Sequence, residues 1–366
     1  MCELKDLPRA VLAALLVLGA GCGDDAAADT TDAIGDAGAC EPRPVDAGPD
    51  PGECVAGPDD YAPCEDDAWP ACISDDGEYH RIEQTISSIA RVAAFEEIAE
   101  LLFDPTGRPS SEDFLQARMI YQEDEGLDSR VVRRYDPHYE VGDDVDCTMQ
   151  ADVEANPDYC VGPARIQPLI LGAIQDGMAG EQPTLQAARV EAGLLWFLYV
   201  STFKESFTCT TKAKDCDSSW AYYTGGEPAR GGLGLSRYVR EVDPYAHDRA
   251  WDGLLAQRCW RDVDDAEVAE DLELRDRARG QADRAVTDGL AAIVRDRLVR
   301  VQEGLADEAA YHWITAEVLG GVLDREAQVR DADLAASLRD ALGEADPADA
   351  DLNAAVAALD GLFECP

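Results

Sequence analysis

The stretch that decides the fold is AARVEAGLLWFLYVSTFKESFTC, which runs from Ala187 to Cys209. Between Ala192 and Phe203 this stretch is apolar on every face of a helix. A helix of that kind belongs inside a large protein or in a membrane, and spanning a bilayer takes about 20 apolar residues. The apolar run is shorter than that, so it predicts a helix buried at the centre of a helical domain.

Helical spacing of apolar residues recurs along the chain from about residue 75 onwards. The last segment illustrates the pattern, because Leu352, Val356, Leu359 and Phe363 follow one another at steps of four, three and four. No alternating pattern of useful length predicts a strand. The sequence therefore predicts an all-α fold, a disulfide-stapled multi-helix bundle that follows an acidic N-terminal tether.

The charge of the chain limits its partners. Acidic residues outnumber basic ones by 75 to 31, and the net charge is −44. No cluster of Lys and Arg is present to neutralise phosphates, so we expect no nucleic-acid binding. The same negative field repels anionic membrane surfaces, so any membrane attachment has to come from a lipid.

The N-terminus has the layout of an export signal. Lys5 and Arg9 precede an apolar run, and the small residues 19–21 lead directly to Cys22. A cysteine at that place resembles the bacterial lipoprotein signal. The resemblance implies that residues 1–21 are removed and that Cys22 is lipidated, although the pattern usually has Leu where this chain has Gly19. The alternative is ordinary secretion that leaves Cys22 unmodified.

Two further segments follow the signal. Residues 22–76 are rich in Asp, Ala, Gly and Pro and have almost no apolar periodicity. Such a composition cannot bury enough apolar surface to offset the entropy of ordering, so it predicts a disordered tether. Residues 77–366 are expected to form a single helical domain. We place the mature protein outside the cytosol, on the outer membrane or the periplasmic face of a bacterial membrane.

The cysteines agree with export. The sequence has 12 of them, and ten remain when Cys2 is lost with the signal and Cys22 is acylated. An even number in an oxidising compartment predicts disulfides, and no CxxC spacing suggests zinc. Proximity in sequence favours the pairs Cys40–Cys54, Cys64–Cys72, Cys147–Cys160, Cys209–Cys216 and Cys259–Cys365, but the sequence leaves the pairing open.

Four residues are candidate metal ligands. His80 and Glu83 lie one helical turn apart at the start of a predicted helix, so an imidazole and a carboxylate could share one ion. Glu191 and Glu205 lie on one face of the apolar helix, as in carboxylate-bridged metal bundles. The alternatives are a solvated helix start for the first pair and, for the second, carboxylates that mark where the helix leaves the core.

Aromatic residues follow the short basic loop between Cys209 and Cys216. Trp220, Tyr222 and Tyr223 are candidate ligand-site aromatics, with core packing as the alternative. No catalytic motif accompanies them. Ser201 and Lys204 form an S-x-x-K pair, but the companion motifs S-D-N and K-T-G are absent, as is G-x-S-x-G. We therefore expect a protein that is not an enzyme.

A family resemblance rests on two short motifs. The segment W-A-Y-Y-T-G (Trp220–Gly225) and the later R-C-W (Arg258–Trp260) resemble exported helical iron-assimilation proteins, which are loosely related to the imelysin type. The resemblance implies a metal-linked binding role. Imelysin-type proteins carry G-x-H-x-x-E, whereas here Gly77 stands one residue too early for His80 and Glu83. The family's metal ligands are therefore not transferred to this chain.

These observations predict a lipid-anchored binding protein of the bacterial envelope, with iron or another metal ion as the candidate ligand. The alternative is a surface interaction or structural lipoprotein that has no small ligand and binds other envelope proteins. An envelope hydrolase ranks last, because no motif supports it.

Overall fold

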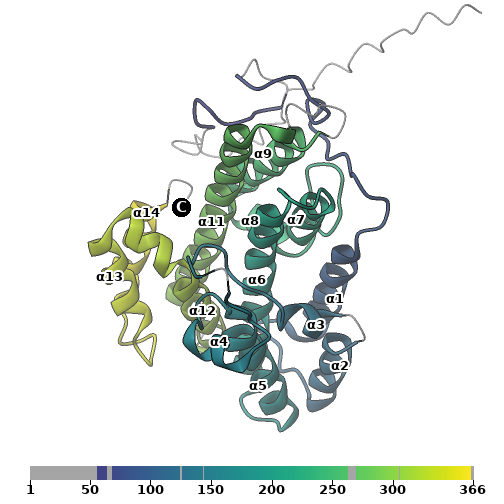
Figure 1. Cartoon of the computed structure of the whole chain (residues 1–366). Coiled ribbons are helices and arrows are strands. Elements are labelled where there is room, and N and C mark those ends of the chain that lie inside the picture. Colours follow the sequence, from purple (N-terminus) through teal and green to yellow (C-terminus); the bar gives the residue numbers. More distant parts are fainter. Residues whose placement is uncertain are drawn as a thin grey trace, which may run out of the picture. The chain divides into compact units, whose positions relative to one another are not determined.

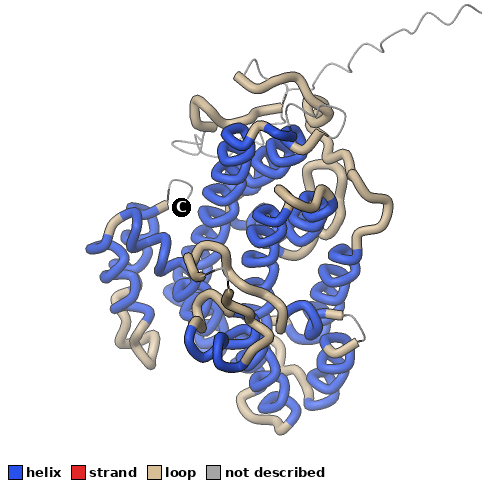
Figure 2. The backbone as a smooth tube through the Cα atoms, viewed as in Figure 1, coloured by secondary structure: helices blue, strands red, loops and turns tan. Residues whose placement is uncertain are grey.

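The computed structural model describes residues 56–63, 68–123, 126–142, 144–262, 269–304 and 306–363. The chain divides into two units, Met1–Ala39 and Cys40–Pro366, and all described residues belong to the second. They form helices joined by loops, and none of them lies in a strand (Figures 1 and 2). The predicted all-α, disulfide-stapled fold is confirmed. The helices are α1 (Ser87–Leu102), α2 (Ser111–Tyr121), α3 (Leu127–Val131), α4 (Gln150–Ala155), the π-helix η1 (Gly162–Ile166), α5 (Gln167–Met178), α6 (Pro183–Thr208), α7 (Lys214–Thr224), α8 (Leu235–Val242), α9 (Pro244–Trp260), α11 (Leu272–Glu303), α12 (Ala306–Arg330), α13 (Ala332–Leu342) and α14 (Leu352–Leu362).

Helix α6 is the predicted central helix. It begins at Pro183, whose fixed φ and missing N–H suit the first helical position. Most of its 26 residues are buried, against α5, α7 and α12 above all. Burial on every side explains why its apolar residues do not form a single stripe.

The long helix α11 is the second organising element. It packs along α9 and α12, and Figure 1 shows α9 and α11 side by side. Asp271 begins α11 as its N-cap and accepts hydrogen bonds from the N–H groups of Glu273 and Leu274. Gly253 on α9 permits the close approach of the two helices, because a Cβ there would lie 2.5 Å from the Cα of Ala282.

The segment before α1 packs on these helices. We call residues 56–63 and 68–86 the N-terminal strap. Within it, Tyr61 and Trp69 are 1% and 8% exposed, and Tyr61 exchanges two backbone hydrogen bonds of 2.8 Å with the Gln281 amide on α11. The prediction of a disordered tether over residues 22–76 is therefore wrong for 56–63 and 68–76, and the rest of that segment lies outside the described residues. Two aromatic side chains supply apolar surface that the composition of the whole tether conceals.

The disulfides confirm part of the predicted pairing. Cys147 is bonded to Cys160, and Cys209 to Cys216, as the sequence suggested. Cys72 is bonded to Cys259, with 5.3 Å between their Cα atoms, so the predicted pairs Cys64–Cys72 and Cys259–Cys365 are wrong. The strap folds back onto α9 and brings together two cysteines that are 187 residues apart. The pair Cys40–Cys54 lies outside the described residues.

The start of α1 differs from the prediction. The helix begins at Ser87, so His80 and Glu83 lie in the strap and not on a helix. The cause is the Asp217 carboxylate on α7, which accepts the N–H groups of Ile82 and Glu83 at 2.9 and 2.7 Å. Those bonds bind the strap's backbone to α7 and leave it non-helical.

A side-chain cap sets the boundary between α12 and α13. Helix α12 continues to Arg330. Asp331 is the N-cap of α13, and its side chain accepts from the N–H groups of Asp333 and Leu334. Among the helices of the described residues, none has the length and the apolar character that a bilayer crossing requires.

Candidate functional site

A cavity of about 310 Å³ lies between α5, α6, α12 and the loops around α4. Ligand pockets in proteins usually measure about 300 to 1,000 Å³ and combine an apolar wall with a few polar groups. This cavity is at the small end of that range, and its lining has that mixed character. We call it the α6–α12 cavity. It is lined by Asp136, Tyr139, Asp158, Val161, Arg165, Leu169, Trp196, Val318, Gly321 and Val322.

The loop that carries its polar groups is held at both ends. The N–H of Asp136 donates to the carbonyl oxygen of Tyr159 at 2.7 Å, which pairs the beginning of the loop with its end. The disulfide Cys147–Cys160 closes the same loop from within. A loop tied in this way can hold charged side chains at a fixed place over the helices.

The π-helical turn η1 follows the loop directly. It begins at Gly162, where a Cβ would collide with the backbone of Val131 and Arg134, so only glycine allows this approach. Arg165 of η1 lines the cavity. Single π-helical turns are frequent at functional sites, because they re-aim side chains within a helix.

His138 lies between two carboxylates. Its Nδ1 is 2.6 Å from Asp136 Oδ1, and its Nε2 is 2.9 Å from Asp283 Oδ1 on α11. Burial alone would lower the pKa of His138, but the hydrogen bonds and charges of the two carboxylates outweigh it and raise the pKa to about 9. The ring is thus an imidazolium at neutral pH, and it ties the loop to α11.

Asp136 lines the cavity and contacts His138 through one of its two carboxylate oxygens. Its Oδ1 accepts from His138 twice, from Nδ1 and from the backbone N–H at 3.0 Å. Its Oδ2 has no hydrogen-bond partner among the described residues. The carboxylate is therefore positioned by the loop and still has an acceptor available to a ligand.

Trp196 is the exception on the central helix. From Val190 to Thr202 every residue of α6 is buried except this one, which lines the cavity. No residue in the described part of the chain accepts a hydrogen bond from its indole N–H. An indole that is half-buried beside a carboxylate offers an apolar face, a site for a cation over the ring and one free donor.

The charged groups nearest to solvent form a pair. Arg165 and Asp158 make an ion pair, with 48% and 50% of their side chains exposed. Tyr139 lies close to them, and burial raises the pKa of its phenol, with Asp136 and Asp158 acting in the same direction and Arg325 and Arg165 opposing them. The phenol therefore stays neutral and can donate or accept a hydrogen bond.

Two adjacent glycines on α12 differ in their surroundings. A Cβ at Gly320 would collide with Leu342, so this glycine allows α12 and α13 to pack closely. A Cβ at Gly321 would meet nothing within 4 Å, and Gly321 lines the cavity. The absence of a side chain at Gly321 leaves the cavity open without any packing requirement.

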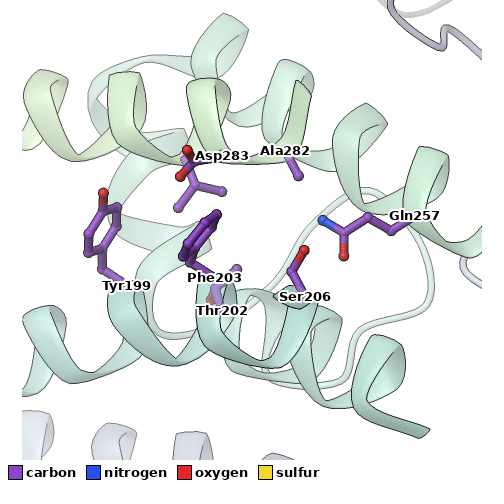
Figure 3. A pocket seen from close by; sticks show the side chains of 8 residues that line it. Tyr199, Thr202, Phe203, Ser206, Gln257, Ala282 and Asp283 are labelled. Carbon is purple, nitrogen blue, oxygen red and sulfur yellow. The ribbon is translucent and has the colours of Figure 1, made fainter. Parts of the chain in front are cut away.

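A second, much smaller cavity lies between α6, α9 and α11 (Figure 3). It measures about 10 Å³, which is room for about one water molecule. Figure 3 shows the Ser206 hydroxyl and the Gln257 amide facing one another across it, and neither has a hydrogen-bond partner among the described residues. Asp283 also lines this cavity, so the chain Asp136–His138–Asp283 joins the two.

The predicted ligand Glu191 is fully engaged by the protein. It is 1% exposed, and it accepts from Tyr238 at 2.9 Å, from Arg297 at 3.0 Å and from Thr315 at 3.0 Å. These donors come from α8, α11 and α12. The carboxylate therefore joins four helices through a buried ion pair, and its position in the core contradicts the reading that it marks the end of the buried region.

Glu205 has a separate set of partners. Its carboxylate is 2.7 Å from Arg134 Nη1 and 3.2 Å from Lys204 Nζ. Burial would raise the pKa of Glu205, but the charges of Arg134 and Lys204 outweigh it and hold the pKa below its ordinary value. Glu205 thus neutralises a buried arginine that the sequence analysis did not identify.

The other predicted metal ligands do not join these carboxylates. The His80 imidazole is 2.7 Å from Asp76 on the surface of the strap, and Glu83 is exposed. Among the described residues, no group of three or more His, Cys, Asp or Glu could hold a metal ion. The four predicted ligands therefore do not form one centre. Cys22, the predicted lipidation site, lies outside the described residues.

The predicted ligand-site aromatics are core residues. Trp220 stacks on Tyr79 with 4.6 Å between the ring centroids, and its Nε1 donates to the carbonyl oxygen of Glu227. The Tyr222 hydroxyl accepts from Arg134 at 2.7 Å, and the Tyr223 hydroxyl is 3.2 Å from His247 Nδ1. All three are at most 1% exposed and line neither cavity, so the core-packing alternative describes them.

Sequence reasoning missed Asp136, Trp196 and Asp283 altogether. One signal was available for the region, since a long charged loop in a compact domain is more often functional than idle. A tryptophan inside an otherwise aliphatic helix was a second signal, although a buried tryptophan gives the same pattern. Nothing in the sequence links Asp283 to His138, which is 145 positions away.

Comparison with known proteins adds no identification. No family model matches this chain, and no curated protein and no solved structure matches it either. The resemblance to iron-assimilation proteins stays a prediction from two short motifs.

Proposed function

We propose that this chain is an exported binding protein that takes a small organic molecule into the α6–α12 cavity. The observation that carries the proposal is the cavity itself, about 310 Å³ in volume, with an apolar wall and a preorganised carboxylate. Proteins usually position the polar groups of a binding site before the ligand arrives, and here a disulfide and a buried imidazolium do so.

The cellular setting agrees with this role. The disulfides Cys72–Cys259, Cys147–Cys160 and Cys209–Cys216 indicate an oxidising compartment outside the cytoplasm. The lipoprotein-like sequence around Cys22 supports attachment to a bacterial membrane through a lipid, and we include this anchor in the proposal. A tethered binding protein would retain its ligand at the envelope.

An organic ligand fits the residues better than a bare metal ion. Glu191 and Glu205 already neutralise buried arginines, and a metal would have to displace those cations. The α6–α12 cavity contributes two carboxylates but no histidine nitrogen to its lining. Iron or another metal ion therefore becomes the second candidate ligand, motivated by the sequence resemblance alone.

A plug in the cavity tests the proposal. Gly321→Phe adds a ring where a Cβ meets nothing, so it should fill the cavity without disturbing the packing of α12. Gly172→Phe on α5 is the matched control, because a Cβ there also meets nothing and the position is exposed and outside the cavity. Thermal-shift screening of a mixed set of small metabolites should find compounds that stabilise the wild type and the control but not the plugged variant.

Two outcomes would contradict the proposal. The first is that no compound stabilises the wild type, and the second is that stabilisation survives in Gly321→Phe. Metal analysis of protein purified without chelator tests the second candidate ligand. Stoichiometric metal that is lost in Glu191→Ala/Glu205→Ala would make a metal ion the preferred ligand.

The alternative function also has one observation in its favour. Trp220, Tyr222 and Tyr223 are core residues, as an interaction or structural lipoprotein without a small ligand requires. On that alternative Trp220→Ala lowers stability, and Gly321→Phe leaves every binding property unchanged. The behaviour of the plugged variant therefore separates the two functions.

A further inference from the structure

We infer that the ligand of the α6–α12 cavity is a small amphipathic amine, whose protonated nitrogen binds Asp136 and whose apolar body packs on Trp196. This inference rests on the proposed function, and it names the class of molecule that the same cavity takes. The argument depends on the charge of the lining, on the free oxygen of Asp136 and on the nature of the opposite wall.

The lining has an excess of negative charge. Two carboxylates, Asp136 and Asp158, and one guanidinium, Arg165, face the cavity. Behind Asp136 the positive charge of His138 is balanced by Asp283, so these two leave the excess unchanged. The positive charge of Arg325 opposes the rise in the pKa of Tyr139, but Arg325 is paired with Glu326 at 3.4 Å and adds no net charge. The net charge of −44 on the whole chain adds a long-range field of the same sign.

The negative charge available to a ligand is concentrated on one atom. The charge of Asp158 is already neutralised by Arg165, and both side chains are about half exposed to solvent. Asp136 is 7% exposed, and its Oδ2 has no hydrogen-bond partner in the described part of the chain. An unpaired oxygen on a largely buried carboxylate binds a charged donor more strongly than a neutral one.

The rest of the lining suits an apolar body. Trp196 contributes the largest apolar face, and Leu169, Val318 and Val322 complete the wall. The indole and the Tyr139 ring can also attract a cation over their faces. A fully hydrophilic cation would leave this wall without a partner, and an anion would face Asp136. The combination therefore selects one positive charge on an apolar frame.

Three probes that share a phenylethyl group separate the charge states. We would titrate 2-phenylethylamine, 2-phenylethanol and 3-phenylpropionate into the full-length protein at neutral pH by calorimetry. The amine should bind about tenfold or more tightly than the alcohol, because a charge-assisted hydrogen bond to a buried acceptor is stronger than a neutral one. The carboxylate probe should bind most weakly.

Substitution of two aspartates identifies the atom responsible. Asp136→Asn keeps an oxygen for His138 and removes the charge in the cavity, so the preference for amine over alcohol should fall to about twofold or less. Asp283→Asn is the matched control, because it removes the other carboxylate of His138 without changing the lining of the α6–α12 cavity. The control should lose less of the preference than Asp136→Asn does, because the carboxylate that lines the cavity is kept. Circular dichroism and thermal melting would check that both variants are folded.

The possible results distinguish this inference from the proposed function. If the alcohol or the carboxylate binds as tightly as the amine and Gly321→Phe abolishes that binding, the amine is wrong and the binding cavity stands. If Asp283→Asn loses the preference as fully as Asp136→Asn does, the proposed contact between the amine and Asp136 is wrong. Both substitutions would then change ligand binding by altering His138. If none of the three probes binds the wild type, the inference fails, and the thermal-shift screen with Gly321→Phe still decides the proposed function.

Discussion

Gly320 and Gly321 are adjacent in sequence but have different physical roles. Both glycines lower the stability of helix α12 relative to alanine. At Gly320 the missing side chain lets α12 and α13 pack closely, whereas at Gly321 it leaves open space. A glycine in a helix costs about 1 kcal/mol relative to alanine, so each position needs a reason. Packing against Leu342 is the reason at the first position, and the open cavity is the reason we propose for the second.

Alanine substitution should separate the two roles. We expect Gly321→Ala to stabilise the protein by up to about 1 kcal/mol, because helix propensity improves and nothing is displaced. We expect Gly320→Ala to destabilise it by about 1 to 3 kcal/mol, as overpacking of a core does. Urea denaturation of both variants measures the difference. Equal effects of the same sign would contradict this account.

His138 controls how stability depends on pH. Its pKa is raised from an ordinary value near 6.5 to about 9, so the folded state binds its proton more tightly than the unfolded state. This stabilisation is complete below pH 6.5 and is lost as the pH rises to about 9. It amounts to something on the order of 3 kcal/mol. His247 and His312, whose pKa values burial lowers to about 3 and about 4, are neutral in the folded state throughout that range, and in the unfolded state they lose their protons as the pH rises past about 6.5.

The pH dependence predicts the behaviour of a neutral variant. In His138→Gln the free energy of unfolding should fall less between pH 6.5 and 9 than it does in the wild type, and the two curves should converge at the alkaline end. Urea titrations at a series of pH values would provide both curves. Parallel curves would mean that His138 is not protonated in the folded state.

At the scale of elements, the N-terminal strap contributes buried side chains to the core as a helix does. It is joined to α9 by Cys72–Cys259 and to α11 by the hydrogen bonds between Tyr61 and Gln281. Local composition predicts disorder for this segment, but tertiary contacts and a covalent bond compensate for the entropy of ordering it. The loop beside the α6–α12 cavity is held in the same way by Cys147–Cys160.

The disulfides should differ in their contribution to stability. Cys72–Cys259 spans 187 positions and Cys209–Cys216 spans 7, so the first restricts the unfolded chain far more. On the chain-entropy model, Cys72→Ala/Cys259→Ala should cost about 3 kcal/mol more than Cys209→Ala/Cys216→Ala. Thermal or urea unfolding of the two double variants is the measurement. An equal cost would show that the strap gains little from its covalent link.

At the scale of the whole molecule, charge and anchoring act together. A net charge of −44 favours cations near the surface and opposes binding to anionic lipid, so the anchor cannot be electrostatic. We predict that the mature protein begins at a lipidated Cys22. Mass spectrometry of the protein isolated from bacterial membranes should find an acylated N-terminal cysteine, and Cys22→Ser should release the protein into the soluble fraction. An unmodified Cys22 would leave ordinary secretion as the explanation.

Local information was sufficient for much of the architecture. The all-α class, the buried helix α6 and the two short disulfides Cys147–Cys160 and Cys209–Cys216 follow from residues that are neighbours in sequence. Helical periodicity depends on positions three and four apart, and short loops close at a low entropic cost. Such features can be predicted because their partners are close along the chain.

The site depended on tertiary structure. Asp136, Trp196 and Gly321 come from one loop and two different helices, and only packing brings them to one cavity. The same holds for Cys72 and Cys259, and for the buried arginines that engage Glu191 and Glu205. A sequence pattern gives the face on which a side chain lies, but which residue lies opposite is decided when the helices pack.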